Sequence, residues 1–321
     1  MCSLLKDIQI NKKRINMKNI VITSGKRYID IDAYAACIAY RELLKIENNN
    51  VYAFTSGAYN ESISKLIKEI PYDFDTYKPT SNDDFIILDV SNKEVFDEEV
   101  ILENIVEIID HHTGYEEYWK DRVKSNIEFI GSVCTQIYEI YINKNKKSLL
   151  NPNLCKLLIA GILDNTLGLK ASITTDRDIN AYNELLKIGN IDTDWWKEYF
   201  VSCEEEIKKD LIQSLINDMK IEHTSNYLPE VFGQIMLFDK NIIYNRLEEV
   251  KEIFNNYNKD WILNLICIED GKSYIISSSN SKEKIEELFN NKFIEDTLIL
   301  NKFMLRKEII KKARDKDNNI D

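Results

Sequence analysis

Two of the chain's three histidines stand side by side after an aspartate, in the triplet Asp110-His111-His112. The run before this triplet, residues 105–109, is apolar except for one glutamate and is typical of a buried strand. Such a strand delivers the triplet to the carboxyl edge of a sheet, where open α/β folds bind ligands. Imidazole and carboxylate groups suit a divalent metal ion, and Asp110 can orient an imidazole by accepting its other N–H.

Three further carboxylates stand at or just past strand-like runs upstream. Asp30 and Asp32 lie between a strand and a helix, and Asp89 lies near the end of the run 85–90. Carboxylates that converge from several strand ends can hold Mg²⁺ or Mn²⁺, and two nearby ions can activate water for attack on a phosphoryl group. Simpler explanations stay open, because the aspartates can cap the helix or a loop and the histidines can be hydrogen-bonded core residues.

A basic segment, residues 305–312, stands near the C-terminus of an otherwise acidic chain. Its Arg306 and Lys307 follow an apolar run and could reach into a cleft between two domains to hold phosphate oxygens. The alternative is a solvated helix face. Lys220, after a long helix, is open to the same two interpretations, and His223 has no obvious partner.

These residues need a parallel sheet to bring their strand ends together. Strand-like and helical stretches alternate through the first half, which is typical of βαβ units and of a mainly parallel sheet with helices on both faces. The expected strands are 19–24, 51–55, 85–90, 105–109 and 127–130. The expected helices are 32–45, 61–69, 115–122, 133–144, 152–163 and 175–187.

A change of character after Ile191 indicates a second, smaller α+β domain. Its expected strands are 232–238, 261–268 and 272–277, and its expected helices are 245–254 and 281–290. Two helices are expected at 192–200 and 204–219, the second amphipathic and charged, and this segment could bridge the two domains. We therefore expect a metal-binding domain, a helical linker and a substrate-binding domain, with an active-site cleft between the domains, at residues 17–195, 196–215 and 216–315.

Both ends of the chain are polar. Met17 is a candidate start, and the sixteen residues before it are not expected to fold, while the tail 315–321 is expected to fray.

Composition restricts the classes of function. The 321 residues carry a net charge of −12, which disfavours nucleic acid and anionic membranes as partners. Six scattered cysteines without a CxxC pair are typical of reduced thiols in a cytoplasmic protein. There is no apolar run of the roughly 20 residues that a membrane span needs, and no secretory signal pattern. A small phosphate-containing substrate is the expected partner, and a homodimer is compatible with the sequence.

The motifs resemble those of the DHH phosphoesterase superfamily, in the branch with a DHHA2 C-terminal domain. This branch includes the manganese-dependent (family II) inorganic pyrophosphatases and related exopolyphosphatases. The likeness covers about residues 17–315 and consists of five segments in chain order. They are 25–32, Leu88-Asp89-Val90, Asp110-His111-His112, 160–166 with its continuation 170–178, and 305–308.

The resemblance implies a role for each matching residue. Two divalent ions, Mn²⁺ or Mg²⁺, would be held by Asp30, Asp32, Asp89 and His111. Asp89 would bridge the ions, and Asp89 and His112 would be the catalytic residues. The substrate phosphates would contact His112, Lys220, Arg306 and Lys307, the last two brought over the metals by closure of the second domain.

Two positions depart from the family pattern. The histidine of the first motif aligns with Lys26, which would oppose a metal, point away, or bind phosphate directly. The aspartate of the fourth motif aligns with Asn165, whose carbonyl oxygen can still coordinate, and Asp164 could supply the missing charge if the loop shifts. Weaker metal binding, with Mg²⁺ preferred to Mn²⁺, is therefore expected. The exopolyphosphatase-like members also lack the first histidine, so its loss is compatible with activity.

The expected function is metal-dependent hydrolysis of phosphoanhydride bonds in inorganic pyrophosphate or short-chain polyphosphate. One alternative is a catalytically weakened relative that binds a phosphorylated ligand as a sensor. Another is a phosphodiesterase that cleaves oligonucleotides or cyclic dinucleotides, as other DHH proteins do. Those proteins carry a DHHA1 domain with a glycine-rich segment, whereas the second half of this chain has isolated glycines such as Gly233 and Gly271.

Overall fold

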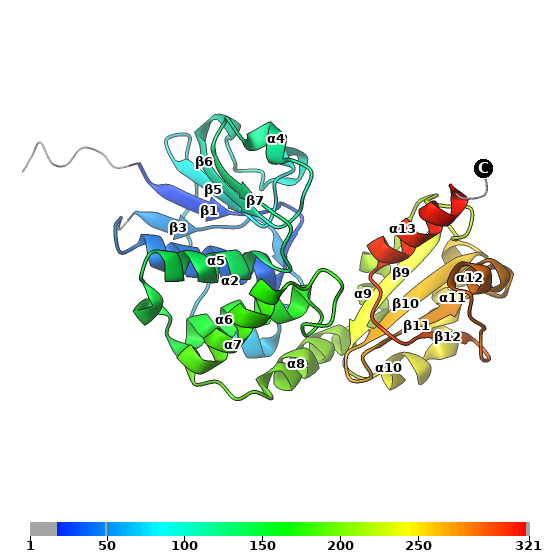
Figure 1. Ribbon diagram of the computed structural model, residues 1–321. Coiled ribbons are helices and arrows are strands. Elements are labelled where there is room, and N and C mark those ends of the chain that lie inside the picture. Colours follow the sequence, from blue (N-terminus) through cyan, green and yellow to red (C-terminus); the bar gives the residue numbers. More distant parts are fainter. Residues whose placement is uncertain (1–17, 49, 319–321) are drawn as a thin grey trace, which may run out of the picture. The chain divides into compact units, whose positions relative to one another are not determined.

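The computed structural model describes residues 18–48 and 50–318, and their contacts group them into two compact units (Figure 1). Of the described residues, the first unit holds those up to Asn60, Pro71–Gly161 and Asn180–Asn190. The second unit holds Glu61–Ile70, Ile162–Ile179 and the chain from Ile191 onward. Two segments that precede residue 180 thus group with the second unit. The three-part division at 17–195, 196–215 and 216–315 stays a prediction.

The first unit is built on a five-stranded sheet in the order β3-β1-β5-β6-β7, in which every neighbouring pair is parallel. Its strands are β1 (Ile20–Thr23), β3 (Val51–Ala53), β5 (Asp84–Leu88), β6 (Ile105–Asp110) and β7 (Lys124–Ile127). A separate parallel pair is formed by β2 (Tyr28–Ile29) and β4 (Ala58–Tyr59). Because all five strands run the same way, their carboxyl ends meet at one edge of the sheet.

Helices cover both faces of this sheet. On one face α2 (Ile31–Leu44) and α5 (Val133–Asn143) pack against each other and against the strands (Figure 1). On the other face Trp119 of α4 (Glu116–Trp119) packs with Phe96 against Phe85 and Ile87 of β5. Burial on both faces explains why the central strands are nearly continuous apolar runs. The remaining helices before residue 190 are α3 (Lys65–Lys68), α6 (Pro152–Asn165) and α7 (Asp176–Gly189), with 3₁₀ turns at Lys93–Val95, Leu102–Asn104 and Lys147–Leu149.

The second unit is built on a mixed five-stranded sheet in the order β12-β11-β10-β9-β8. The pair β9–β10 is parallel and the other three pairs are antiparallel. The strands are β8 (Lys220–Ile221), β9 (Val231–Leu237), β10 (Trp261–Cys267), β11 (Lys272–Ser277) and β12 (Thr297–Leu300). The helices are α8 (Trp195–Lys209), α9 (Leu211–Asp218), α10 (Asn241–Tyr244), α11 (Leu247–Tyr257), α12 (Lys282–Phe289) and α13 (Arg306–Asp317), with a 3₁₀ turn at Ser279–Ser281.

Two apolar clusters cover the opposite faces of this mixed sheet. Val231 of β9 faces the cluster formed with α9, α10 and α11. The next residue, Phe232, faces the cluster formed with α12 and α13. This alternation is the period of two that a strand imposes on its side chains. The predicted fold class, a parallel α/β domain with a smaller α+β domain, is confirmed.

Several predicted boundaries are wrong. The strand expected at 127–130 lies at Lys124–Ile127, because this polar edge strand is half exposed and its residues do not form an apolar run. The expected helices 61–69 and 115–122 are single turns. The bridging helices break at Asp210, whose carboxylate caps α9 by accepting the backbone N–H of Gln213. The short strands β2, β4, β8 and β12 were not predicted.

The prediction that residues 315–321 are frayed is wrong for residues 315–317, because α13 continues to Asp317. Glu308 starts this helix by accepting the backbone N–H of Leu305. The expectations for residues 1–16, Met17 and residues 319–321 lie outside the described part of the chain. Within that part, no helix has the length and hydropathy to cross a membrane.

The carboxylate of Asp83 anchors the amino end of β5. It accepts hydrogen bonds from the Tyr77 hydroxyl at 2.7 Å, the Thr80 backbone N–H at 2.7 Å and the Asn19 amide at 2.9 Å. Burial acts to raise the pKa of Asp83, but these hydrogen bonds outweigh burial and hold the pKa below its usual value. The ionised carboxylate therefore stabilises the fold above the pKa of the unfolded chain, and this contribution is lost as the pH falls through the folded pKa.

We expect Asp83→Asn to destabilise the protein at pH 7 by about 1–3 kcal/mol, because three hydrogen-bond donors lose a charged acceptor that is itself buried. The difference from the unsubstituted chain should shrink below about pH 4, where the unfolded carboxyl begins to protonate. Thermal unfolding at pH 7 and at lower pH measures both effects. Asp84→Asn is the matched control, since it breaks a largely exposed ion pair with Lys18. A pH-independent difference would contradict this prediction.

Candidate metal centre

The candidate ligands follow two neighbouring strands at the point where each strand ends. Asp89 comes directly after β5, and His111 and His112 come directly after β6. The backbone N–H of Asp89 donates to the carbonyl oxygen of Ile109 at 2.9 Å, which fixes this residue to the neighbouring strand. Asp89 has φ = 66°, in the left-handed region that aspartate and asparagine tolerate best after glycine.

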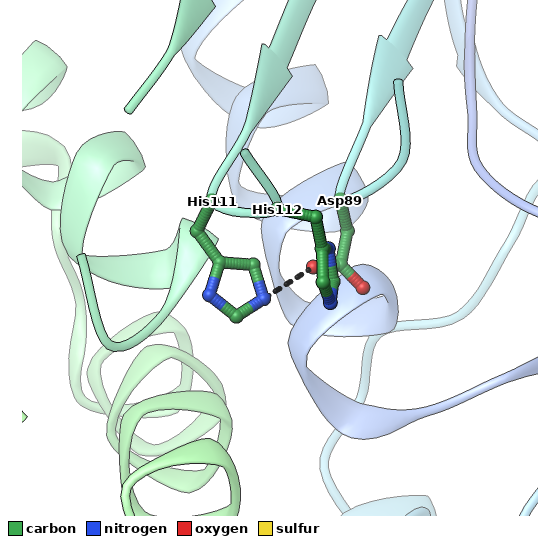
Figure 2. Close-up of side chains that lie close together, drawn as sticks. All are labelled: Asp89, His111 and His112. Atoms are coloured by element: carbon green, nitrogen blue, oxygen red, sulfur yellow. Dashed lines mark ion pairs between the residues drawn. The ribbon is translucent and has the colours of Figure 1, made fainter. Parts of the chain in front are cut away.

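The side chains of Asp89, His111 and His112 converge (Figure 2). One possible ligand atom from each lies within 4.8 Å of the others. Asp89 Oδ1 is 3.3 Å from His111 Nε2, yet both atoms are buried and neither makes a hydrogen bond within the described residues. Unpaired buried polar atoms are rare because they are costly. A metal ion would satisfy both atoms, so these residues fit a cation.

The second nitrogen of each imidazole is already held. His111 Nδ1 lies 3.1 Å from the carbonyl oxygen of Ile130, which assigns the proton to Nδ1 and leaves Nε2 as the ligand atom. His112 Nδ1 lies 2.9 Å from Asp110 Oδ1. Burial acts to lower the pKa of His112, but the hydrogen bond to Asp110 and the charges of Asp89 and Asp110 together outweigh burial and raise it. The raised pKa favours the protonated imidazole, which suits a phosphate better than a metal ion.

Asp30 and Asp32 lie at the start of α2. Asp30 caps this helix by accepting the backbone N–H of Ala33 at 3.0 Å. Asp32 is almost fully buried, and its Oδ2 is 3.9 Å from His111 Nε2, so it borders the cluster. Asp32 therefore lies near the predicted metal position. Asp30 makes the helix cap that the simpler explanation required, and its role as a metal ligand stays a prediction.

The carboxylate of Asp32 also holds the N-terminus of α5. It accepts hydrogen bonds from the Ser132 hydroxyl at 2.6 Å and from the backbone N–H groups of Val133 and Cys134, each at 3.0 Å. Hydrogen bonds of this kind stabilise a buried negative charge and fix its direction. Asp32 is thus a structural link between two helices as well as a candidate ligand.

Negative charge accumulates at this edge of the sheet. Burial raises the pKa of Asp89 well above its usual value, and the charges of Asp30 and Asp32 raise it further. Burial and the charge of Asp32 also raise the pKa of Asp30. A bound cation favours the ionised form of each carboxylate, which is a second physical reason to expect a divalent ion here.

Gly161 of α6 allows the close approach of this helix to Asp32. A Cβ atom at Gly161 would lie 2.5 Å from Cys134 Sγ and 3.0 Å from Asp32 Oδ1. Neither group has room to retreat, because Cys134 and Asp32 are buried. The close packing of α6 against Asp32 therefore explains why a glycine stands at this position of the fourth motif.

The other predicted residue of the first unit, Lys26, is exposed, and its backbone N–H donates to the carbonyl oxygen of Val95. Asp164 and Asn165 belong to the second unit. Asp164 Oδ1 accepts a hydrogen bond from the Tyr199 hydroxyl at 2.7 Å. The roles given to these three residues stay predictions.

The predicted phosphate contacts Lys220, Arg306 and Lys307 also belong to the second unit. Lys220 and Lys307 are exposed, whereas Arg306 is largely buried and forms an ion pair with Asp218 at 2.8 Å. Burial raises the pKa of Asp218, and the charges of Arg306 and Lys220 both oppose this increase. Arg306 and Lys220 therefore act on one shared carboxylate, while the approach of these cations to the metal cluster stays a prediction.

Sequence reasoning gave no role to four residues that shape these sites. Ser132 and Gly161 each had a signal, since a serine before an apolar helical pattern indicates an N-cap and an isolated glycine inside one indicates close packing. The carbonyl group of Ile130 and the carboxylate of Asp218 had none.

The parallel α/β unit and its Asp-His-His edge define the class of protein. Residues 19–162 match the family model described as the DHH family, N-terminal domain, so the chain contains a DHH domain. The predicted resemblance is confirmed. The chain is 22% identical to a probable manganese-dependent inorganic pyrophosphatase from Bacillus licheniformis, over 90% of this chain and 96% of the relative. It is 21% identical to the manganese-dependent inorganic pyrophosphatase of Bacillus subtilis, over 90% and 95%.

Two solved structures share the fold. A putative family II inorganic pyrophosphatase from Methanococcus jannaschii matches with a TM-score of 0.62 and 20% identity, covering 93% of this chain and all of the other. An exopolyphosphatase-related protein from Bacteroides fragilis matches with a TM-score of 0.51 and 16% identity, covering 97% and 95%. The chain is thus a distant homologue of the family II pyrophosphatases, with their fold.

Proposed function

We propose that this protein is a metal-dependent hydrolase of phosphoanhydride bonds, acting on inorganic pyrophosphate or short-chain polyphosphate. The observation that carries this proposal is that Asp89 Oδ1 and His111 Nε2, at neighbouring strand ends, are buried, lie 3.3 Å apart and make no hydrogen bond within the described residues. The distant homology to manganese-dependent inorganic pyrophosphatases supports the same chemistry.

Asp89 and His111 would hold the cation, Mn²⁺ or Mg²⁺, with Asp30 and Asp32 beside them. When bound, such an ion lowers the pKa of water and neutralises negative charge on phosphoryl oxygens. Asp110 keeps His112 oriented and favours its protonated form, so that His112 can donate a hydrogen bond to a phosphate oxygen. Further roles belong to the proposal. They are a second ion that shares Asp89, a ligand from Asn165 or Asp164, and phosphate contacts from Lys220, Arg306, Lys307 and Lys26.

The setting we propose is cytoplasmic, with a small phosphate-containing substrate and with neither nucleic acid nor membrane as a partner. The net charge of −12 supports this setting, because it repels polyanions except where a cation is bound. A homodimer is the proposed assembly.

A metal screen tests the proposed reaction. The full chain is freed of metal and then supplied with Mn²⁺, Mg²⁺ or Co²⁺, and phosphate release is measured from pyrophosphate, tripolyphosphate and long polyphosphate. We expect release from the short substrates that exceeds release by an Asp89→Asn, His111→Gln double variant. The proposal fails if no metal produces this excess. Faster hydrolysis of a dinucleotide than of pyrophosphate would favour a phosphodiesterase instead.

A second candidate function is a catalytically weakened relative that senses a phosphorylated ligand. It is favoured by one observation: the Asp164 carboxylate already accepts a hydrogen bond from Tyr199, so it is less available to replace the charge missing at Asn165. A sensor would be stabilised against heat by pyrophosphate and metal without turnover.

Restoring the family pattern separates the two candidates. If the chain is a weakened relative, we expect Lys26→His with Asn165→Asp to raise phosphate release at least about tenfold, because an anionic and a nitrogen ligand are added. Isothermal titration with Mn²⁺ should show tighter binding in the same variant. Asn151→Asp, which matches the charge change of Asn165→Asp on an exposed residue of the first unit, is the control. Unchanged turnover and metal affinity would count against the sensor.

A further inference from the structure

The guanidinium group of Arg306 is held at one end by Asp218. Its Nη1 donates to Asp218 Oδ2 at 2.8 Å and to the carbonyl oxygens of Asp218 at 2.8 Å and Phe232 at 3.1 Å. Its Nη2 donates to Asp218 Oδ1 at 3.1 Å. The carboxylate therefore occupies the fork formed by Nη1 and Nη2, in the two-point geometry that fixes the plane of the guanidinium.

A hydrogen-bond network fixes this carboxylate and the start of α13 to the mixed sheet. Asp218 Oδ2 also accepts the backbone N–H of Gln234 at 2.8 Å. Gln234 Oε1 accepts the backbone N–H of Arg306 at 2.6 Å and the amide of the buried Asn264 at 3.1 Å. The Asn264 amide also donates to the carbonyl oxygen of Met304 at 2.7 Å. Backbone and side chain of Arg306 are thus both immobilised.

The opposite edge of the guanidinium remains available. An arginine presents two forks, one from Nη1 and Nη2 and one from Nε and Nη2. Over the described ranges, the Nε of Arg306 makes no hydrogen bond, and its Nη2 makes one. A pair of phosphate oxygens matches such a fork. The exposed Lys220, whose charge also acts on Asp218, adds a second cation to the same neighbourhood.

We infer that Asp218 is a positioning residue, which occupies one fork of Arg306 and thereby presents the Nε–Nη2 fork to two phosphate oxygens of the substrate. This inference rests on the proposed function, because the phosphoanhydride substrate supplies those oxygens. Holding the guanidinium in one orientation before binding removes the need to order a long side chain when the substrate arrives. The opposite arrangement, in which Asp218 competes with the substrate for Arg306, predicts a gain of activity when Asp218 is removed.

A double-mutant cycle tests the inference on the full chain with pyrophosphate. We expect Asp218→Ala to lower kcat/KM by about 10–100-fold, the range seen when the residue that orients a contacting group is removed. Arg306→Ala should lower it at least as much. The double variant should match Arg306→Ala alone, because Asp218 acts through Arg306. Asp218→Asn keeps an acceptor and should lose less, and it replaces the alanine variant if that variant does not fold.

Asp270→Ala is the matched control, since Asp270 pairs with Lys240 in the same unit at 2.6 Å and should leave kcat/KM unchanged. A purely structural role for Asp218 predicts a further loss in the Arg306→Ala background. That loss, or activity in Asp218→Ala and Asp218→Asn equal to or above that of the unsubstituted chain, would overturn the inference.

If the unsubstituted chain releases no phosphate with any metal, the proposed function fails. The role of Asp218 can then still be tested by measuring how tightly the chain binds pyrophosphate. Inorganic pyrophosphate is then titrated calorimetrically into the full chain with Mg²⁺ present. We expect Asp218→Ala to bind at least tenfold more weakly, with no further loss in the double variant relative to Arg306→Ala. Absent binding, or equal binding by Asp218→Ala and the unsubstituted chain, would overturn the inference.

Discussion

Asp89→Asn is expected to lower metal-dependent phosphate release at least about 100-fold, comparable to other losses of a group that stabilises transition-state charge. The substitution replaces a carboxylate by a neutral amide at the atom that faces His111 Nε2. Asparagine is the sharper choice than alanine, because Asp89 has φ = 66° and asparagine tolerates this backbone conformation. The loss can therefore be assigned to charge and coordination rather than to strain.

Although Asp89→Asn should lose activity, its thermal stability in the absence of metal should not fall. Without metal, removal of a buried charge beside Asp30 and Asp32 relieves repulsion, so the Tm should stay equal or rise. With Mn²⁺ added, the unsubstituted chain should be stabilised and the variant much less so. Asp84→Asn, at the other end of the same strand, is the control for both measurements. If Asp89→Asn keeps full activity, or if Mn²⁺ stabilises it as much as the unsubstituted chain, the proposed metal site is wrong.

Gly161→Ala is expected to destabilise the first unit by up to about 2 kcal/mol. Alanine in a helix is favoured over glycine by about 1 kcal/mol, so an ordinary site would gain stability. Here the new Cβ would lie 2.5 Å from Cys134 Sγ and within 3.1 Å of Asp32, and overpacking of a filled core costs about 1–3 kcal/mol. Displacement of Asp32 should also weaken metal binding. Thermal unfolding and Mn²⁺ titration measure the two effects.

Cys134→Ala provides the internal test of this explanation. It removes the sulfur atom nearest to the new Cβ, so Gly161→Ala should cost less in the Cys134→Ala background than alone. Part of the cost should remain, because Asp32 Oδ1 stays 3.0 Å from the Cβ position. A cost of the same size in both backgrounds would show that the clash with Cys134 is not its cause.

Local patterns predicted the parts of the fold that short-range physics controls. Largely apolar runs of four to six residues marked β1, β5 and β6, because strands buried on both faces hold few polar residues. Parallel strands end at one edge, so Asp89 and His111 could be expected to lie close together before any coordinates were known. The polar edge strand β7 was misplaced because edge strands lack that apolar signal.

The amino-acid sequence by itself thus determined which residue types stand at the strand ends, and with them the chemistry of the edge. The tertiary structure alone decided how each group is used. Asp32 meets Ser132 across 100 residues of chain, and Asp218 meets Arg306 across 88. No periodicity connects residues so far apart, because their contact depends on how whole helices and sheets pack. Contacts of this kind fix the orientation of each group. The carbonyl oxygen of Ile130 decides which nitrogen of His111 faces Asp89, and Asp218 decides which fork of Arg306 is left open.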